Sequence, residues 1–348
     1  MNTLTWGMIV CTYNRVDFLV ECLKHVLGQT RPPSEVCVVD ASDDWEANRD
    51  RVKETYADHW ERVRLVYEPA KVRSITYQRT QALQAAEADV IISLDDDIYL
   101  YPDAAEKVMD VYESDPDERI AMVAALFAHM PPGEDTGQRD EAAAPKAPGL
   151  ASQLRQLLEN QLSLDAHFVP YDAPHEPGEL PPGVETTGAR VGGLVNGGRT
   201  TFRRKFGLQE GWSPLLLRYA THEDSDFSYR MSKHGLLVLQ PEALFFHADG
   251  NDGRYDRFRS GTIRVLNLMA LHRESSSSRL RSSLRLTATF ARFAGLYALI
   301  DPARKRFSLP NVRAYALGAG LVPFFMFYPF EDFRGWYHEQ QKRLYNRG

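Results

Sequence analysis

The sequence is poor in cysteine. Only three of its 348 residues are cysteines, Cys11, Cys22 and Cys37, and there is no C-x-x-C spacing. Cys11 and Cys37 lie in apolar segments of the type that form buried strands. An odd number of thiols in such segments excludes a disulfide scaffold and is typical of a reduced, cytoplasmic protein.

Targeting and membrane-spanning segments are also missing. Residues 1–7 contain neither a charged n-region nor an apolar core, so no signal peptide is predicted. The longest uncharged run, residues 314–330, contains two prolines and is shorter than the roughly 20 residues that a spanning helix needs. We therefore expect a cytoplasmic protein without a spanning helix.

Basic residues are not in excess. The chain has 41 Lys and Arg against 47 Asp and Glu, a formal net charge of −6. This balance excludes wholesale binding of nucleic acid by a basic surface. Hydrophobic residues make up 43% and charged residues 25%, as in ordinary globular proteins, and the length allows one large α/β domain or two ordinary ones.

Short β-branched runs alternate with segments of helical spacing in the first 130 residues. The predicted strands are 7–12, 35–40, 62–67, 89–94 and 120–127, and the predicted helices are 16–27, 45–56, 74–86 and 102–112. This alternation predicts an α/β fold with a mostly parallel central sheet and helices on both faces. Ligands of such sheets bind beyond the carboxyl ends of the strands.

The later part of the chain changes in character. Two Pro/Gly-rich stretches, 131–149 and 170–183, flank a short predicted helix at 150–164 and form an insertion of about residues 131–190. Strand and helix patterns resume at Val191 and at 224–234, and short closing strands are predicted at 236–239 and 243–246. We expect a catalytic domain over residues 1–250 and a mainly helical, more basic region over 251–348.

Three consecutive carboxylates, Asp95, Asp96 and Asp97, follow directly on a predicted buried strand. Because like charges repel, such a cluster indicates a positive partner, and oxygen ligands favour a hard cation such as Mg²⁺ or Mn²⁺. Strand alternation predicts that Asp95 and Asp97 point to one side and Asp96 to the other. The alternative is a solvated acidic turn ahead of the next helix.

Two other groups lie at element boundaries. Glu223 and Asp224 begin a predicted helix, where the helix dipole stabilises negative charge, so they indicate either a capped helix start or a general base. His247 follows an apolar strand, where it is either a structural histidine or a metal ligand.

Five motifs occur in a recognisable order: residues 10–15, 38–44, 94–97, 192–204 and 222–224, with His247 beyond them. In order and spacing they resemble glycosyltransferase family 2, the inverting nucleotide-sugar transferases with a GT-A fold, over about residues 6–250. The resemblance implies a Rossmann-like α/β catalytic domain followed by a helical C-terminal extension.

The resemblance also implies roles for particular residues. Donor binding would involve residues at or near strand ends: Thr12, Asn14, Arg15, Asp40, Arg73, Asp95 and Asp96. Asp97 and His247 would hold Mn²⁺ or Mg²⁺. Asp224 would take the proton from the acceptor hydroxyl, and Glu223 would hold the acceptor or orient Asp224.

Acceptor binding would involve Gly193, Trp212 and Glu223. Trp212 either stacks on a sugar face or fills apolar space, and Arg73 is either a nucleotide ligand or a surface arginine. The basic residues that follow His247, Arg254, Arg257 and Arg259, either meet the diphosphate or form a solvated helix start.

The implied activity is metal-dependent, inverting transfer of a sugar from a nucleoside diphosphate, with UDP favoured, to a hydroxyl of a glycan, lipid-linked or small-molecule acceptor. No Q-x-x-R-W motif follows His247, so a non-processive enzyme is expected. One alternative is a sugar-phosphate nucleotidyltransferase, but the Gly-rich phosphate loop of that class is absent after the first strand. The other alternative is a catalytically silent carbohydrate-binding protein.

The tail has a basic amphipathic pattern. Four arginines, Arg279, Arg281, Arg285 and Arg292, alternate with Leu and Phe, and residues 321–330 are rich in aromatics. One hypothesis is docking on the anionic cytoplasmic face of a membrane, with a lipid-linked acceptor. The other is a helical unit that packs on the catalytic core or on a second copy.

Overall fold

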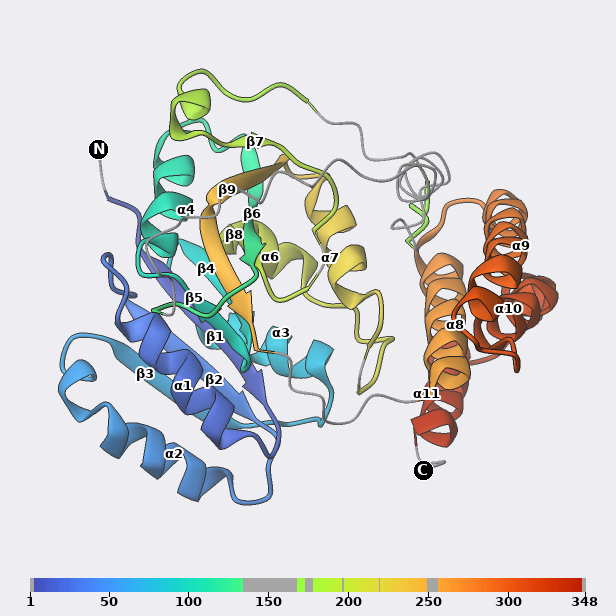
Figure 1. Cartoon of the computed structure of the whole chain (residues 1–348), viewed down its shortest axis with the longest axis horizontal. Helices are drawn as coiled ribbons and strands as arrows, with labels where there is room; N and C mark the ends of the chain where they lie inside the picture. The colour runs from blue at the N-terminus through green and yellow to red at the C-terminus, as the bar shows by residue number, and fades with distance from the viewer. Residues whose placement is uncertain are drawn as a thin grey trace.

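The computed structural model describes residues 3–133, 168–172, 178–195, 197–218, 220–248 and 256–345. The helix predicted at 150–164 and most of the first Pro/Gly-rich stretch lie outside these residues. The part of the chain that the structure describes forms a sheet with helices on both faces, followed by a group of helices at one side (Figure 1).

The strands form one mixed sheet. They are β1 (Trp6–Thr12), β2 (Glu35–Asp40), β3 (Arg64–Pro69), β4 (Val90–Asp95), β5 (Ile98–Leu100), β6 (Ile120–Ala128), β7 (Arg190–Val191), β8 (Thr200–Arg203) and β9 (Leu236–His247). Their order is β3-β2-β1-β4-β8-β6-β9-β5, with β7 paired to β9. The first four strands are parallel, β8 is antiparallel to both of its neighbours, and β6 is parallel to β9.

The sheet differs from the predicted one at its second half. The strands β5 and β8 were not predicted, since each is only three or four residues long. The two predicted closing strands are the halves of one strand, β9, on either side of a register shift. Ala125 pairs with Gln240 and Leu126 with Leu244, so residues 241–243 bulge out of the ladder at Pro241, which has no N–H to donate.

Among the described residues, the α-helices that accompany the sheet are α1 (Val16–Leu27), α2 (Trp45–Thr55), α3 (Ile75–Ala85), α4 (Ala104–Glu113), α6 (Arg204–Glu210) and α7 (Glu223–Met231). Side chains of β1 alternate between two cores. Met8 and Val10 pack with residues of α1 and α4, whereas Ile9 packs with residues of α3 and α7. Burial on both faces explains why the central residues of β1, β2 and β4 are mostly apolar, whereas the edge strand β3 is partly exposed.

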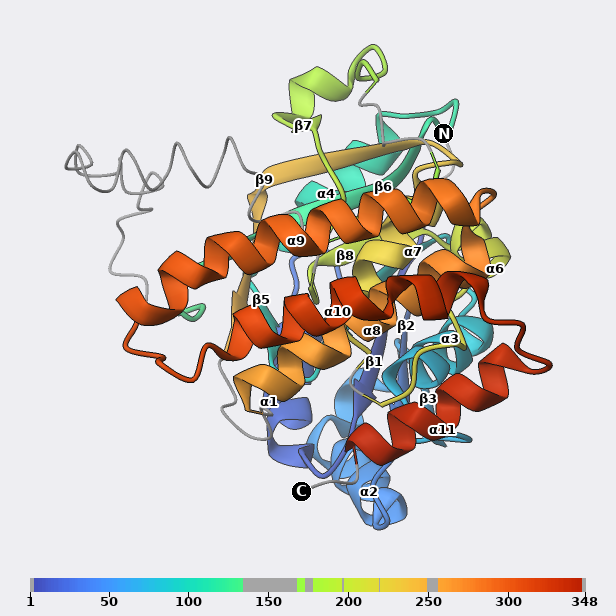
Figure 2. The same cartoon turned by 90° about the vertical axis from the view of Figure 1, so that its right-hand side faces the viewer.

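The C-terminal region is helical, as predicted. It comprises α8 (Arg257–Ser275), α9 (Arg279–Ala303), α10 (Pro310–Phe327) and α11 (Phe333–Tyr345). These helices share a third core with the loop before α7, which contributes Leu215 and Leu216, and with Tyr229 of α7. α9 and α10 lie side by side on the outside of this region, with α8 behind them (Figure 2).

None of the helices among the described residues is both long enough and apolar enough to cross a lipid bilayer.

Candidate active site

The carboxyl ends of β1, β2 and β4 meet at one edge of the sheet. Gln78 of α3 ties two of these ends together, because its side-chain amide donates to the carbonyls of Thr12 at 3.3 Å and Val39 at 3.1 Å. Beyond β1 the chain turns at Asn14, which has a φ of 53° and donates its N–H to Ser42 Oγ at 2.8 Å. Asparagine tolerates this left-handed conformation better than most residues do.

The acidic triplet divides differently from the prediction. Asp96 accepts a hydrogen bond from Thr12 at 2.7 Å and lies 3.3 Å from Nη1 of Arg15. Asp97 accepts from Nη2 of the same arginine at 2.6 Å. Asp95 instead accepts from Arg79 on the other side. The predicted alternation fails because β4 ends at Asp95 and the next two residues form a turn, in which side chains do not follow the strand period.

Two guanidinium groups therefore supply part of the positive charge that the triplet needs. Burial raises the pKa of Asp96 to about 7, although the charge of Arg15 and the hydrogen bond from Thr12 oppose this. Burial opposes ionisation of Asp97 as well. There the neighbouring His247 and Arg15 outweigh the burial and hold the pKa of Asp97 below its ordinary value. The three carboxylates are thus placed in three different environments.

A cation can be held by Asp97 and His247. The Oδ1 atom of Asp97 is buried, accepts no hydrogen bond of good geometry from the described residues, and lies 3.4 Å from Nε2 of His247. The two residues are brought together because β5 pairs with β9, with Ile98 opposite His247. A carboxylate oxygen with an imidazole nitrogen suits Mn²⁺, whereas Mg²⁺ prefers oxygen alone. Among the residues described, no three acidic, histidine or cysteine side chains converge on one metal position.

Arg79 of α3 joins the triplet to the acidic residues of α7. It donates to Glu223 and, at 2.6 Å, to Asp95, and its own side chain is 5% exposed. Burial raises the pKa of Glu223 to about 8, although the charge of Arg79 opposes the shift. The Oε2 atom of Glu223 is buried without a hydrogen-bond partner among the described residues. Glu223 therefore faces Arg79 and does not reach the surface.

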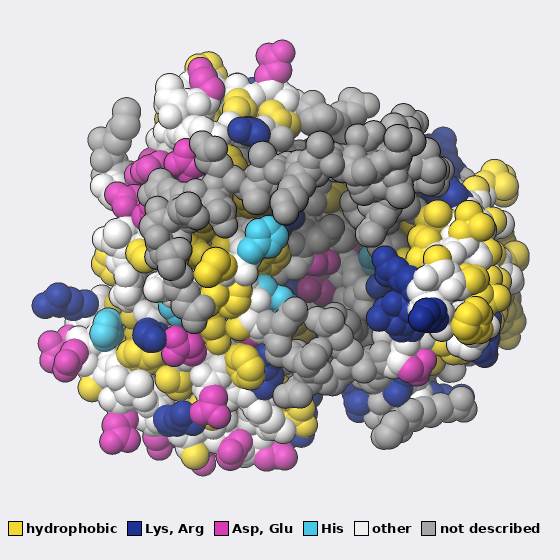
Figure 3. All heavy atoms as spheres, in the orientation of Figure 1, with side chains coloured by type: hydrophobic (Ala, Val, Ile, Leu, Met, Phe, Trp, Pro, Cys, Tyr) yellow, Lys and Arg dark blue, Asp and Glu magenta, His cyan; other side chains and the backbone are white. Residues whose placement is uncertain are grey.

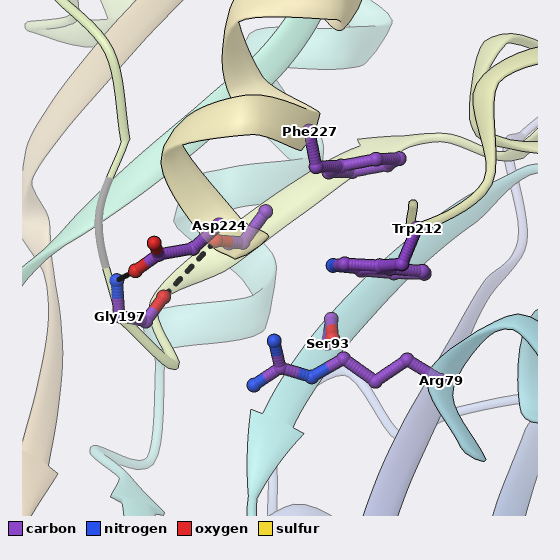
Figure 4. Close-up of a pocket in the computed structure, with 7 residues that line it drawn as sticks. Arg79, Ser93, Gly197, Trp212, Asp224 and Phe227 are labelled. Atoms are coloured by element: carbon purple, nitrogen blue, oxygen red, sulfur yellow. Dashed lines mark hydrogen bonds between the residues drawn. The ribbon is translucent and has the colours of Figure 1, made fainter. Parts of the chain in front are cut away.

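Asp224 is held at the start of α7 by backbone groups. One carboxylate oxygen accepts from the N–H of Gly197, and the other accepts from the N–H of Ser225 at 2.7 Å. Figure 4 shows the carboxylate directed toward Gly197 and away from Arg79. A carboxylate oxygen has two lone pairs, so these bonds orient Asp224 and still leave acceptor sites for a substrate hydroxyl.

The loop at Gly197 and Gly198 places this carboxylate near the triplet. Gly197 has a φ of 78°, which favours glycine, and its N–H contacts Asp224. A Cβ at Gly198 would lie 3.1 Å from Oδ2 of Asp95 and 3.0 Å from Ile98, so a larger residue would require these neighbours to shift by a few tenths of an ångström. Asp224 and Asp95 thus stand on either side of one short glycine loop.

A small pocket lies beneath this loop. Its lining residues are Arg79, Ser93, Gly197, Thr200, Trp212, Asp224 and Phe227. Phe227, Trp212 and Arg79 form three layers at one side of it (Figure 4). In the space-filling view, acidic side chains lie at the bottom of a hollow between the sheet and the C-terminal helices, with histidines at its edge (Figure 3).

Trp212 has no free face for a sugar. Its ring stacks on Phe227 with 4.2 Å between centroids, the guanidinium carbon of Arg79 lies 5.7 Å from its centre, and the residue is 4% exposed. The apolar-filler alternative describes this packing, and stacking on an acceptor would require the layers to separate. An added Cβ at Gly193 would meet no atom within 4 Å among the described residues, and its contact with an acceptor stays a prediction.

The remaining predicted donor residues, Asp40 and Arg73, lie at the end of β2 and between β3 and α3. Asp40 is buried and accepts from the N–H of Ser42, from Asn48 and from Tyr67 at 2.7–2.9 Å. Arg73 is exposed, pairs with Asp43, and lies 5.8 Å from the centre of the Tyr13 ring. Contact of Asp40 or Arg73 with a nucleotide stays a prediction.

The sequence reasoning missed Arg79, Gly197 and Gly198. Arg79 lies within the octapeptide 73–80, which departs from the pattern expected of the family, and that departure was the only signal. The glycines lie within the predicted acceptor segment, 192–204, but their contacts join residues more than 25 positions apart.

The fold is of the GT-A kind, with carboxylates at the ends of its strands. Residues 8–159 match the family described as Glycosyl transferase family 2. Over 114 residues the chain is 35% identical to glucosyl-dolichyl phosphate glucuronosyltransferase of Haloferax volcanii, covering 32% of this chain and 35% of that protein.

Two further likenesses agree with this assignment. Over 113 residues the chain is 29% identical to hyaluronan synthase of Streptococcus pyogenes, covering 31% of this chain and 26% of that protein. The matches thus span only about a third or a quarter of the relatives' lengths. The chain also resembles the structure of the mannosyltransferase PcManGT from Pyrobaculum calidifontis in complex with GDP-Man and Mn²⁺. The alignment covers 92% of this chain and 87% of that chain, with a TM-score of 0.52 and 16% sequence identity. This likeness shows a shared fold.

Proposed function

We propose that this protein transfers a sugar from a nucleoside-diphosphate sugar to an acceptor hydroxyl, with inversion and with the help of a divalent cation. The observation that carries the proposal is the position of Asp224. Its carboxylate is oriented by two backbone N–H groups, and the Gly197–Gly198 loop that supplies one of them also approaches Asp95 of the acidic triplet. The match of residues 8–159 to Glycosyl transferase family 2 supports the same reaction class.

The donor side rests on the strand ends. Arg15, between Asp96 and Asp97, is 30% exposed in its side chain and is available to a diphosphate. Asp97 and His247 would hold the cation, Mn²⁺ better than Mg²⁺, with phosphate oxygens completing its coordination. When bound, the cation would neutralise the negative charge that develops on the leaving diphosphate.

On the acceptor side, Asp224 would accept the proton of the attacking hydroxyl. The hydroxyl would attack the anomeric carbon from the face opposite the diphosphate, which inverts the configuration. Glu223, held by Arg79, would position the start of α7 instead of contacting the acceptor directly. The role of Arg79 is thus to hold Glu223 and Asp95 in place.

UDP is the nucleotide that the resemblance favours, whereas the Pyrobaculum mannosyltransferase is in complex with GDP-Man. The name of the Haloferax relative specifies a lipid-linked sugar, and this supports a lipid-linked acceptor here among the three predicted kinds. The missing Q-x-x-R-W motif supports transfer of one or a few sugars without processive elongation.

The test is a thermal-shift panel of UDP, GDP, dTDP and CMP, each with Mn²⁺ and with EDTA. A ligand that binds only the native state stabilises it by about 2.7 kcal/mol when its concentration is 100 times its Kd, and this raises the melting temperature. We expect one diphosphate to act, only with the metal, and Asp97→Ala to abolish the shift.

Asp224→Asn separates binding from chemistry. This variant should keep the nucleotide shift and lose about 10²- to 10⁴-fold in donor turnover, because the amide cannot take a proton. Asp117→Asn, an exposed carboxylate in a turn, is the matched control and should behave as wild type. Unchanged turnover in Asp224→Asn would remove the base assignment, and the absence of any nucleotide shift would favour a silent binding protein.

A further inference from the structure

The outer helices of the C-terminal region expose a largely apolar face. In α9, exposed apolar and small residues recur every three or four positions and so lie on one side of the helix. They are Leu280, Leu284, Ala288, Ala291, Gly295 and Leu299, and the exposed Arg281 and Arg292 lie on the same side. The exposed uncharged positions of α10 are Ala316, Leu317, Gly320, Pro323, Phe324 and Phe327. We call these two sets together the outer face.

This face is distinct from the surface that packs on the rest of the protein. The opposite sides of α9 and α10 carry Phe290, Phe293, Phe325 and Met326, which are at most 3% exposed and belong to the third core. Leu280, Leu284 and Leu299, by contrast, are 64–74% exposed, and Phe327 is 52% exposed. Packing on the core therefore explains one side of each helix and leaves the outer face uncovered by the residues that the structure describes.

The outer helices face away from the sheet. Figure 1 shows them at the side opposite α2, and Figure 2, turned by 90°, shows both in front of α8. The space-filling view shows hydrophobic side chains gathered at this end of the molecule, with Lys and Arg side chains beside them (Figure 3). A contiguous apolar surface of this kind is more often a contact site than an accidental exposure.

Charge around the outer face is almost entirely positive. Residues 277–330 contain eight Lys and Arg and one acidic residue, Asp301, which is buried and bound to Asn311 at 2.7 Å. This segment has a formal charge of +7 in a chain of −6, so the remaining residues carry −13. Arg281 and Arg292 of α9 are exposed beside the face.

We propose that the outer face docks this protein on the surface of an anionic lipid bilayer. Leu and Phe side chains would enter the boundary between headgroups and acyl chains, and the arginines would meet the lipid phosphates. A face-to-face dimer of two copies fits less well, because it would bring two sets of eight cations together. The proposal goes beyond the transfer reaction and does not depend on it.

The test is co-sedimentation of the full chain with vesicles of phosphatidylcholine alone or with 30% phosphatidylserine. We expect pelleting with the anionic vesicles, little with the neutral ones, and release as NaCl is raised. Arg281→Gln combined with Arg292→Gln should lower the partition coefficient about 25-fold, at about fivefold per arginine. Leu280→Gln combined with Leu284→Gln should lower it about tenfold or more.

Matched controls lie on the sheet side of the molecule. Leu208→Gln on α6, 43% exposed, and Arg119→Gln, also exposed, should pellet as wild type. All substituted side chains are exposed, so circular dichroism should report unchanged folding. Equal pelleting with both vesicle types, no pelleting with either, or pelleting unaffected by the α9 substitutions would overturn the proposal. So would a dimer by light scattering that the leucine substitutions dissociate without any effect on vesicle binding.

Discussion

Arg79 is the residue on which the two halves of the site depend. Its guanidinium is buried between Glu223 of α7 and Asp95 of β4, and it also covers one face of Trp212. A buried charge of this kind is stable only while its partners remain, because each partner would otherwise be left unpaired in a medium of low dielectric constant. Arg79 is thus structural and functional at once.

Replacement of Arg79 by Met should destabilise the fold by about 1–3 kcal/mol, since it leaves the buried carboxyl group of Glu223 without its hydrogen-bond partner. Chemical denaturation at neutral pH measures this loss. Adding Glu223→Leu to Arg79→Met removes the unpaired polar group and should recover a large part of the stability. If the loss of stability in the double variant equals the sum of the losses in the two single variants, Arg79 and Glu223 do not act as a pair.

Several elements of the C-terminal region hold the loop that precedes the base. Tyr337 of α11 donates to Asn267 of α8 at 2.6 Å, and Asn267 donates to the carbonyl of Thr221 at 3.0 Å. Gln341 of α11 donates to the carbonyl of Leu215 at 2.8 Å. The position of Asp224 therefore depends on helices that follow it by more than thirty residues.

His272 of α8 makes the stability of the folded protein depend on pH. Burial lowers the pKa of His272 to about 4, and its Nε2 lies 2.7 Å from the carbonyl of Val169, where the neutral ring can donate. In the unfolded chain the pKa is about 6.5. The unfolded state therefore binds the proton first as the pH falls, and the folded state loses up to about 3 kcal/mol between pH 6.5 and pH 4.

Urea unfolding of the wild type and of His272→Gln over pH 4–7.5 measures this loss of folding stability. The glutamine amide can still donate to Val169, so the variant should fold, and its stability should fall less steeply with acid. Parallel pH profiles for the two proteins would show that His272 is not the titrating group.

At the scale of the whole molecule, the sheet and the C-terminal helices share one core. Leu215, Leu216 and Tyr229 are nearly fully buried, and each packs in the cluster that α8 to α11 complete. The predicted boundary near residue 250 therefore separates two types of structure, but both sides need the shared core. Whether each side folds by itself is a separate question that truncation answers.

A chain ended at residue 250 should be poorly soluble or melt at a much lower temperature than the full chain, because it exposes the apolar loop before α7. Its soluble yield and thermal unfolding should be compared with those of a chain ended at residue 345. Cooperative unfolding of the shorter chain at the temperature of the full one would establish residues 1–250 as an independent domain.

Local patterns in the sequence were enough to predict most of the parallel half of the sheet and most of the acidic site. Strands such as 35–40 have a continuous apolar centre, Val36 to Val39, because they are buried on both faces, and this property is visible in one segment at a time. Asp95 to Asp97, Glu223 and Asp224 are also recognisable from local sequence. The first three directly follow a predicted strand, and the other two begin a predicted helix. The family resemblance rested on the same local motifs.

Only the tertiary structure decided which of these groups meet. Arg79 is one arginine in a helix with no distinguishing pattern, and its role comes from two partners 16 and 144 residues away. The turn after Asp95 overrides strand alternation and brings Asp96 and Asp97 to the same arginine. Residue types and local periods determine elements, whereas contacts between distant segments depend on how those elements pack. That is the physical reason why the chemistry was predictable in kind and the geometry was not.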